Sequence, residues 1–324
     1  MMKTCMPLPN SAAEMSRRRL IVGLTTFRYR SHMTWAVSGW KSSENFERLS
    51  LWPDQPPGGR GPAGPIRIDD AGAVSHIAVP YVEVYRPINP DGRAVLIAAG
   101  GGYRRIMIQK EARPAARWLV AQGMTAFVLY YRLPDEGWDQ GPLAPFQDAQ
   151  RALRVIRAHA AQYMIDQRRV SVLGFSAGGH LMGLTACRSA FLSYQPVDDW
   201  DALSARPMGA ALVYPIVTLM PPYDHTSTRI ALVGDHPSMA QRKMWSIETY
   251  IRARCPPFFL VQAQDDAISD PDNTTILEQA CLHGDVPVER HVLSEGGHGF
   301  GIGKAGSQTA KWPGWYKNWM LKNI

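Results

Sequence analysis

A serine in a glycine-rich stretch carries the strongest chemical signal in this sequence. Ser176 lies at the centre of GFSAG, residues 174–178, with an apolar run before it and a helical pattern after it. This order matches a nucleophile elbow, a strained strand-to-helix turn that presents a serine Oγ. Side chains at either flanking glycine would collide with the neighbouring strand and helix. We predict that Ser176 is a nucleophile; the alternative is an unreactive serine in a tight turn.

A serine hydroxyl is a weak nucleophile, so it needs a base that a third group holds in place. The best histidine is His298, in the glycine-rich segment EGGHGFG that follows the last strand pattern. His291 lies within that strand pattern and His283 lies in a helical pattern, so both are poorer candidates. We therefore predict that His298 is the base, and the alternative is a solvated loop histidine.

A carboxylate is expected just after a strand, because triad acids lie beyond the carboxyl ends of parallel strands. Four aspartates follow the apolar run at 256–264: Asp265, Asp266, Asp270 and Asp272. The last two flank a proline and fit the start of the next helix. We choose Asp266 as the acid, with Asp265 as the second choice.

Consecutive glycines after another strand pattern predict an oxyanion hole. The stretch AAGGGYRR, residues 98–105, lets backbone N–H groups turn towards a developing negative charge. The expected donors are the amides of Gly101, Gly102 and Tyr103, together with Ala177 after the nucleophile. The Tyr103 ring is also expected to crowd the acyl side of the substrate. A plain turn or a phosphate loop are the alternatives, but the G-K-[ST] and G-x-G-x-x-G patterns are missing.

Further pocket residues are expected after the strand pattern at 210–217. Tyr223 and His225 lie in the following segment, 221–236, and are candidates for substrate binding. A surface loop is the alternative for that segment. His180, one helical turn after Ser176, is expected to be structural and to bond a neighbouring backbone group.

The elements that must position these residues alternate along the chain. Strand patterns occupy 76–87, 93–99, 125–133, 169–175, 210–217, 256–264 and 288–294. Helical patterns occupy 110–122, 146–163, 177–190, 240–252, 272–283 and 313–322. This β-α order predicts an α/β fold with a mostly parallel central sheet and helices on both faces.

Charge and composition exclude several classes of protein. The 324 residues are 45% apolar and carry a net charge of +7, of which residues 1–50 hold +5 (eight Lys/Arg and three acids), leaving +2 for the rest. We therefore expect no nucleic-acid partner. The sequence contains no run of 18 apolar residues, so we predict no transmembrane helix. The four cysteines form no C-x-x-C pair, and we predict no metal and no cofactor.

The N-terminal segment is set apart from the fold. Residues 16–24, SRRRLIVGL, resemble a twin-arginine export signal. Such a signal implies a periplasmic or secreted protein, whereas a basic tail or a mis-assigned start codon leaves it cytoplasmic. We predict that residues 1–45 are this tail or signal. Residues 46–324 are predicted to form one catalytic domain, with a small cap insertion around 218–255.

The motifs together resemble the acetylxylan-esterase-like bacterial carbohydrate esterases, which have the α/β-hydrolase fold. The matching segments are AAGGGY with KEA, FVLYYRLP, PFQDAQRALRVIR, GFSAGGHL, PPFFLVQAQDD and GGHGFG. The resemblance implies a triad of Ser176, Asp266 and His298. The sequence departs from the family pattern at three places: Ala99 before the glycines, Gln262 on the acid strand, and Ser269-Asp270 after it. These departures leave the triad unchanged and bear on which substrate the protein takes.

The resemblance implies a serine esterase that hydrolyses small acyl esters, such as acetyl esters of carbohydrates or other alcohols, through an acyl-enzyme. Members of this group often carry a xylanase label, but glycoside cleavage generally needs two carboxylates that flank the sugar bond. One serine, one base and one oxyanion hole suit acyl transfer instead. The alternatives are a serine peptidase of the prolyl-oligopeptidase type and a non-catalytic binding protein. The oligomeric state is left open.

Overall fold

The computed structural model describes residues 46–324. The twin-arginine-like segment at residues 16–24 lies outside this range, as does the segment that ends at residue 45. Export and the N-terminal boundary therefore stay predictions. None of the helices within residues 46–324 is long and apolar enough to cross a membrane.

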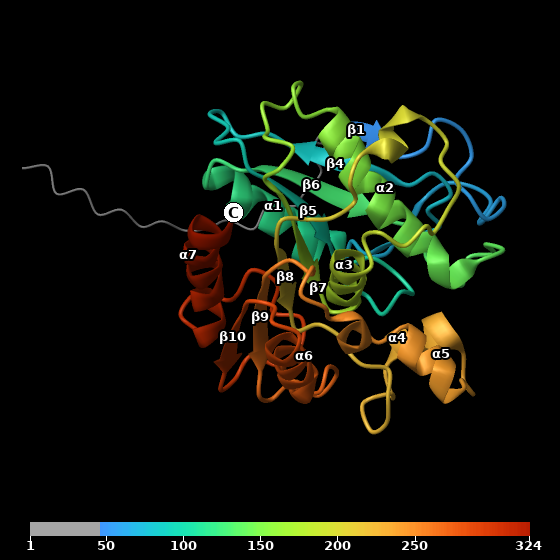
Figure 1. The fold of residues 1–324 in the computed structure, drawn as a ribbon. Helices are drawn as coiled ribbons and strands as arrows, with labels where there is room; N and C mark the ends of the chain where they lie inside the picture. The colour runs from blue at the N-terminus through green and yellow to red at the C-terminus, as the bar shows by residue number, and fades with distance from the viewer. Residues whose placement is uncertain (1–45) are drawn as a thin grey trace, which may run out of the picture. The chain divides into compact units, whose positions relative to one another are not determined.

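The main sheet of the described residues has eight strands in the order β1-β4-β6-β5-β7-β8-β9-β10 (Figure 1). The strands are β1 (Glu47–Ser50), β4 (Tyr81–Tyr85), β5 (Ala94–Ala98), β6 (Thr125–Tyr130), β7 (Val170–Phe175), β8 (Ala210–Val213), β9 (Phe258–Ala263) and β10 (Val288–Leu293). From β6 to β10 all neighbours are parallel, whereas β4 is antiparallel to both β6 and β1. The predicted, mostly parallel sheet is confirmed.

Helices cover both faces of this sheet. They are α1 (Arg113–Ala121), α2 (Ala144–Ala158), α3 (Ala177–Cys187), α4 (Ser227–Val233), α5 (Met239–Met244), α6 (Asp272–His283) and α7 (Trp312–Asn323). Trp118 of α1 stacks on Tyr316 of α7 with ring centroids 6.1 Å apart, so these two helices share a face. Helices α2 and α3 lie on the other face (Figure 1).

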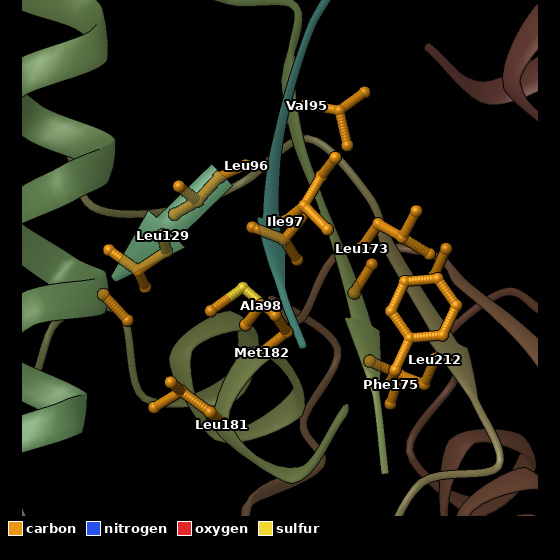
Figure 2. Packing of buried hydrophobic residues seen from close by; sticks show 14 of the residues in the cluster. Val95, Leu96, Ile97, Ala98, Leu129, Leu173, Phe175, Leu181, Met182 and Leu212 are labelled. Atoms are coloured by element: carbon orange, nitrogen blue, oxygen red, sulfur yellow. The ribbon is translucent and has the colours of Figure 1, made fainter. Parts of the chain in front are cut away.

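The central strands are apolar throughout because they are covered on both sides. Leu96 and Ile97 on β5 and Leu173 on β7 are completely buried. Leu181 and Met182 of α3 pack beside the end of β5 (Figure 2). This packing fixes the carboxyl end of β5 and the start of α3 against each other, which is where the candidate residues lie.

Some elements differ from the sequence prediction. The predicted helix at 110–122 begins earlier, with a π-helical turn over Ile108–Ala112 that leads into α1. Pro114 has no N–H to donate to the carbonyl four residues before it, and this favours the irregular turn. The predicted helix at 240–252 is divided into α5 and a 3₁₀ turn, Ile247–Tyr250.

Short strands are the elements that the sequence did not predict. β1 lies at the sheet edge and pairs only with β4. β2 (Arg67–Ile68) and β3 (Val74–Ser75) form a separate two-stranded sheet. Strands of two to four residues have too little alternation to read from a pattern. The segment after β8 holds the short helices α4 and α5, where a cap insertion was expected.

Candidate active site

The nucleophile candidate Ser176 lies in a strained turn between β7 and α3. Its backbone has φ 52° and ψ −120°, a conformation that non-glycine residues rarely adopt. A Cβ added at Gly174 would lie 2.3 Å from the carbonyl oxygen of Gly178, and one added at Gly178 would lie 2.2 Å from that of Ala98. The glycines are therefore needed because backbones meet there without room for a side chain.

His298 joins the other two predicted residues. Its Nε2 lies 2.8 Å from Ser176 Oγ, and its Nδ1 lies 2.8 Å from Asp266 Oδ2. A carboxylate accepts only, so Nδ1 carries a proton, and in the neutral ring Nε2 accepts from the serine hydroxyl. This is the arrangement in which an imidazole can remove the proton of an attacking serine.

Asp266 is held in a buried position by several donors. Its side chain is fully buried, and Oδ1 accepts from the backbone N–H groups of Ile268 and Ser269, each at 2.9 Å. Oδ2 accepts from Gln262 Nε2 at 3.0 Å as well as from the histidine. Gln262, noted above as a departure from the family pattern, thus helps to fix the orientation of the carboxylate.

The neighbouring aspartates have other roles. Asp265 is exposed, and its carboxylate accepts from the N–H of Gly297 at 2.8 Å. The hydrogen bonds from the backbone N–H groups of Gly297 and Gly296 lower the pKa of this carboxyl. It therefore holds the loop that carries His298, and not the imidazole itself. Asp270 accepts from the N–H of Asp272 at the start of α6, as expected for a helix cap. His283 and His291 lie on α6 and β10, and neither lines the cavity described next.

A cavity of about 690 Å³ and one of about 520 Å³ occur in the described residues, and the smaller contains the serine and the histidine. Gly101 and Gly102 line it, with positive φ angles of 124° and 65°. Their N–H groups and that of Ala177 form no hydrogen bond within residues 46–324. The amides of Gly101 and Gly102 are thus free to donate to an oxyanion in this cavity, whereas Ala177 follows the serine in the chain but does not line the cavity. The assignment of these three amides as oxyanion donors stays a prediction.

The prediction for the Tyr103 ring is wrong. Its side chain is 1% exposed and does not line the cavity. A φ of 58° turns the ring into the core, where the hydroxyl lies 3.0 Å from Nδ1 of His180. The ring therefore cannot crowd an acyl group, and this is the part of the prediction that is wrong. The Tyr103 N–H, like those of Gly101 and Gly102, forms no hydrogen bond within residues 46–324, and its role as an oxyanion donor stays a prediction. His180 Nε2 lies 2.6 Å from the carbonyl oxygen of Trp245, so this histidine bonds a backbone group as expected.

Tyr223 and His225 also lie outside the cavity lining. The Tyr223 hydroxyl donates to Asp272 at 2.8 Å, and the His225 ring lies near the carbonyl of Pro222. Residues 226–228, which begin α4, line the cavity instead. The threonine at the helix cap, and not the two predicted aromatic side chains, lines the cavity.

Glu111 is the residue that sequence reasoning missed. Its buried carboxylate lines the cavity and accepts from the N–H of Gly100 at 2.6 Å and from the Tyr214 hydroxyl at 3.1 Å. Tyr214 in turn accepts from the N–H of Gly301, beyond His298. Burial raises the pKa of Glu111. Its only sequence signal was the KEA segment of the family resemblance, which assigned it no role.

We predict that His180 makes stability depend on pH. Burial lowers its pKa from 6.5 to about 4, so below pH 6.5 the unfolded chain binds a proton that the folded chain does not. The free energy of unfolding should therefore fall as the pH decreases from about 6.5 to about 4, by ~1 kcal/mol or slightly more per pH unit. Urea titrations at pH 7 and pH 5 measure this loss.

The control for this prediction is a pair of variants. His180→Gln should show a smaller loss between pH 7 and pH 5 than the wild type, although it is less stable at pH 7. His283→Gln removes a histidine from an exposed helix end and should keep the wild-type pH dependence. Equal pH slopes in all three proteins would contradict the prediction.

We predict that Glu111→Gln lowers kcat by about tenfold or more, with a smaller change in KM, because misplaced catalytic groups cost rate even at small displacements. Both oxygens of the Glu111 carboxylate accept a hydrogen bond, one from Gly100 N–H and the other from Tyr214 O–H. In glutamine an NH₂ group replaces one of these oxygens and cannot accept. One buried donor is thus left without an acceptor, which costs about 1–3 kcal/mol of stability. Steady-state kinetics and thermal denaturation measure both effects. Tyr214→Phe keeps the bond between Glu111 and Gly100 but removes both bonds of the Tyr214 hydroxyl, to Glu111 and from Gly301, so it should also lower kcat.

Comparison with known proteins places these features in a family. The family model described as BD-FAE matches residues 82–281. An endo-1,4-beta-xylanase B of Butyrivibrio fibrisolvens is 30% identical over 212 residues, which is 64% of this chain and 32% of that protein. An acetylxylan esterase of Xylanibacter ruminicola is 27% identical over 223 residues, 68% of this chain and 43% of that protein. The chain thus spans less than half the length of either relative.

Solved structures agree with the fold. The crystal structure of an acetyl ester-xyloside bifunctional hydrolase from Caldicellulosiruptor lactoaceticus is similar with a TM-score of 0.71 and 28% identity, covering 85% of this chain and 96% of that one. An esterase from Thermogutta terrifontis has a TM-score of 0.64 at 20% identity, covering 81% of this chain and 94% of that one. The predicted fold and the family resemblance are confirmed: this chain is an α/β-hydrolase that belongs to the BD-FAE family.

Proposed function

We propose that this protein is a serine carboxylesterase that releases small acyl groups, acetyl foremost, from esters of carbohydrates or other alcohols. The observation that carries the proposal is the imidazole of His298, which lies 2.8 Å from both Ser176 Oγ and Asp266 Oδ2. Free backbone N–H groups lie beside the same serine. These are the parts that acyl transfer through a serine requires.

The reaction follows from this geometry. His298 Nε2 takes the hydroxyl proton as Ser176 Oγ attacks the ester carbonyl, and Asp266 stabilises the imidazolium that forms. The N–H groups of Gly101, Gly102 and Ala177 donate to the carbonyl oxygen as it becomes negative, and the start of α3 adds a favourable dipole. The imidazolium then protonates the leaving alcohol. Water attacks the acyl-enzyme by the same route and releases the acid.

The relatives support an ester of a carbohydrate as the substrate. One is named an acetylxylan esterase, and a similar solved structure is titled an acetyl ester-xyloside bifunctional hydrolase. A panel of p-nitrophenyl acetate, butyrate and octanoate, an aminoacyl-nitroanilide and p-nitrophenyl xyloside tests the class of reaction. Hydrolysis of the acetate above all others is the expected result. Faster release from the nitroanilide or the xyloside would reject an esterase in favour of a peptidase or a glycosidase.

We predict that Ser176→Ala lowers kcat on p-nitrophenyl acetate by at least about 10³-fold, because the nucleophile is lost. Asp266→Asn should cause a loss of similar order, since the amide cannot hold the correct histidine tautomer. Asp265→Asn is the matched control, because that carboxylate bonds only the loop backbone, and it should stay within about tenfold of the wild type. A severe loss in Asp265→Asn with a mild one in Asp266→Asn would move the acid role by one residue.

The cavity carries positive charge around the serine. Arg104, Arg105 and Lys110 line it, and the Arg105 guanidinium lies 3.6 Å from the Asp69 carboxylate. Arg104 and Lys110 have no ion pair within residues 46–324. The lining carboxylate of Glu111 is already occupied by Gly100 and Tyr214. A substrate with a negative charge near its ester is therefore attracted to this cavity.

We predict that 4-acetoxybenzoate is a better substrate than 4-acetoxybenzamide, which has similar size and no charge. The ratio of their kcat/KM values, each corrected for hydroxide-catalysed hydrolysis, should be roughly three or more at low salt and should fall towards one at 0.5 M NaCl. Lys110→Gln should lower the ratio, whereas Lys322→Gln at the end of α7 should not. A ratio that does not change with salt or with Lys110 would contradict the prediction.

A further inference from the structure

A second cavity of the described residues is lined by arginines and is separate from the catalytic one. Its volume is about 690 Å³, and it shares no lining residue with the cavity of Ser176. We call it the arginine cavity, after Arg154, Arg188, Arg206, Arg252 and Arg254. It lies at the carboxyl end of α3, whereas Ser176 precedes the amino end, and the 11 residues of this helix span about 16 Å.

Most of the charge in the arginine cavity is not balanced. The one carboxylate in its lining, Asp201, lies 3.0 Å from Arg151 and also accepts from the Tyr194 hydroxyl at 2.5 Å. Arg154 is the lining arginine near that carboxylate, at 3.9 Å. The other four lining arginines have no carboxylate within ion-pair distance among residues 46–324, and their side chains make at most bonds to backbone carbonyls.

Arg188 is fixed in place without an acceptor. Its guanidinium lies over the rings of Phe191 and Tyr250, at 4.3 and 4.5 Å from their centroids, and 5.5 Å from that of Phe146. Nη1 is buried and has no hydrogen-bond partner in the structure. Stacking of this kind immobilises the planar group, so its unused N–H donors are already oriented. A buried donor without a partner costs stability unless a ligand satisfies it.

The surroundings favour a compact anion over a long polymer. Two further arginines, Arg157 and Arg168, line the adjoining hollow that shares Arg206 with the arginine cavity. Arg157 is buried and donates from all three of its side-chain nitrogens to the carbonyls of residues 167, 204 and 206, and Arg168 pairs with Asp166. The guanidinium donors that remain free therefore surround the hollow of the arginine cavity. Phe191 and Leu192, which are 41% and 81% exposed, add apolar area beside the charges.

We propose that the arginine cavity binds a small organic phosphate, in which the doubly charged phosphate group pairs with the unbalanced guanidinium groups and the organic part lies against Phe191 and Leu192. Guanidinium groups bind phosphate oxygens through pairs of parallel N–H donors, and this geometry is rigid in Arg188. The site does not take part in ester hydrolysis, so its test does not depend on the proposed function.

Isothermal titration calorimetry of the full chain tests the proposal with four probes at pH 7.5: inorganic phosphate, glucose 6-phosphate, glucuronate and a heparin oligosaccharide. NaCl at equal ionic strength is the reference. We expect saturable binding of glucose 6-phosphate. Its Kd should be lower than that of glucuronate and no higher than that of inorganic phosphate. Heat no greater than that of the salt reference would overturn the site. If inorganic phosphate binds and glucose 6-phosphate does not, the proposal of an organic phosphate is rejected. If a heparin oligosaccharide binds much more tightly and displaces glucose 6-phosphate, the proposal of a small ligand is rejected.

Variants decide whether the arginine cavity is the place of binding. Arg188→Gln and Arg254→Gln should each raise the Kd for glucose 6-phosphate by about tenfold or more, because each removes charge-assisted hydrogen bonds. Arg168→Gln removes an exposed, paired arginine and should change Kd less than twofold. Since Arg188 also packs on aromatic rings, circular dichroism and melting without ligand check the fold. The Arg254 side chain makes no hydrogen bond or ion pair within residues 46–324, so its variant keeps the test decisive. Equal weakening by Arg168→Gln and Arg254→Gln would overturn the proposal.

Discussion

The close approach of three backbones at the start of α3 is the constraint on which the site depends. Gly178 lies so near the end of β5 that a Cβ would reach the carbonyl oxygen of Ala98, and Gly174 lies equally near the first turn of the helix. Ser176 has its strained φ at this contact, and its side chain lies beyond the carboxyl ends of β5 and β7. The glycine loop after β5 is brought beside the serine by the same contact, since a Cβ at Gly100 would lie 2.6 Å from Ser176 Cβ.

The remaining groups reach this point from separate parts of the chain, and buried polar bonds tie them together. Glu111 joins the loop after β5 to Tyr214, which follows β8, and Tyr214 joins the loop that carries His298. On the other side, Gln262 of β9 holds the acid. Each bond satisfies a group that burial would otherwise leave unpaired, so the positions of the nucleophile, the base and the oxyanion donors are coupled.

The sequence predicts those features that depend on chain direction and on the period of apolar residues. Ser176, Asp266 and His298 follow strands, and parallel strands bring their carboxyl ends together, so their proximity follows from the order of the elements. Tyr103 was misjudged because its neighbours in sequence place the backbone in the site, whereas a positive φ turns the ring towards His180. Glu111 was missed because its partners are 11 and 103 residues away, and no local pattern records such bonds.

The loop that carries His298 has a consequence for how the protein loses its activity. Residues 296–303 include five glycines with positive φ, and a few bonds hold them, from Asp265, Tyr214 and the indole of Trp312 to the loop backbone. A glycine-rich segment gains more conformational entropy on release than any other, so it opens locally while the sheet stays intact. We therefore expect heat or denaturant to separate the base from the nucleophile before the sheet unfolds, so that activity is lost before the core opens.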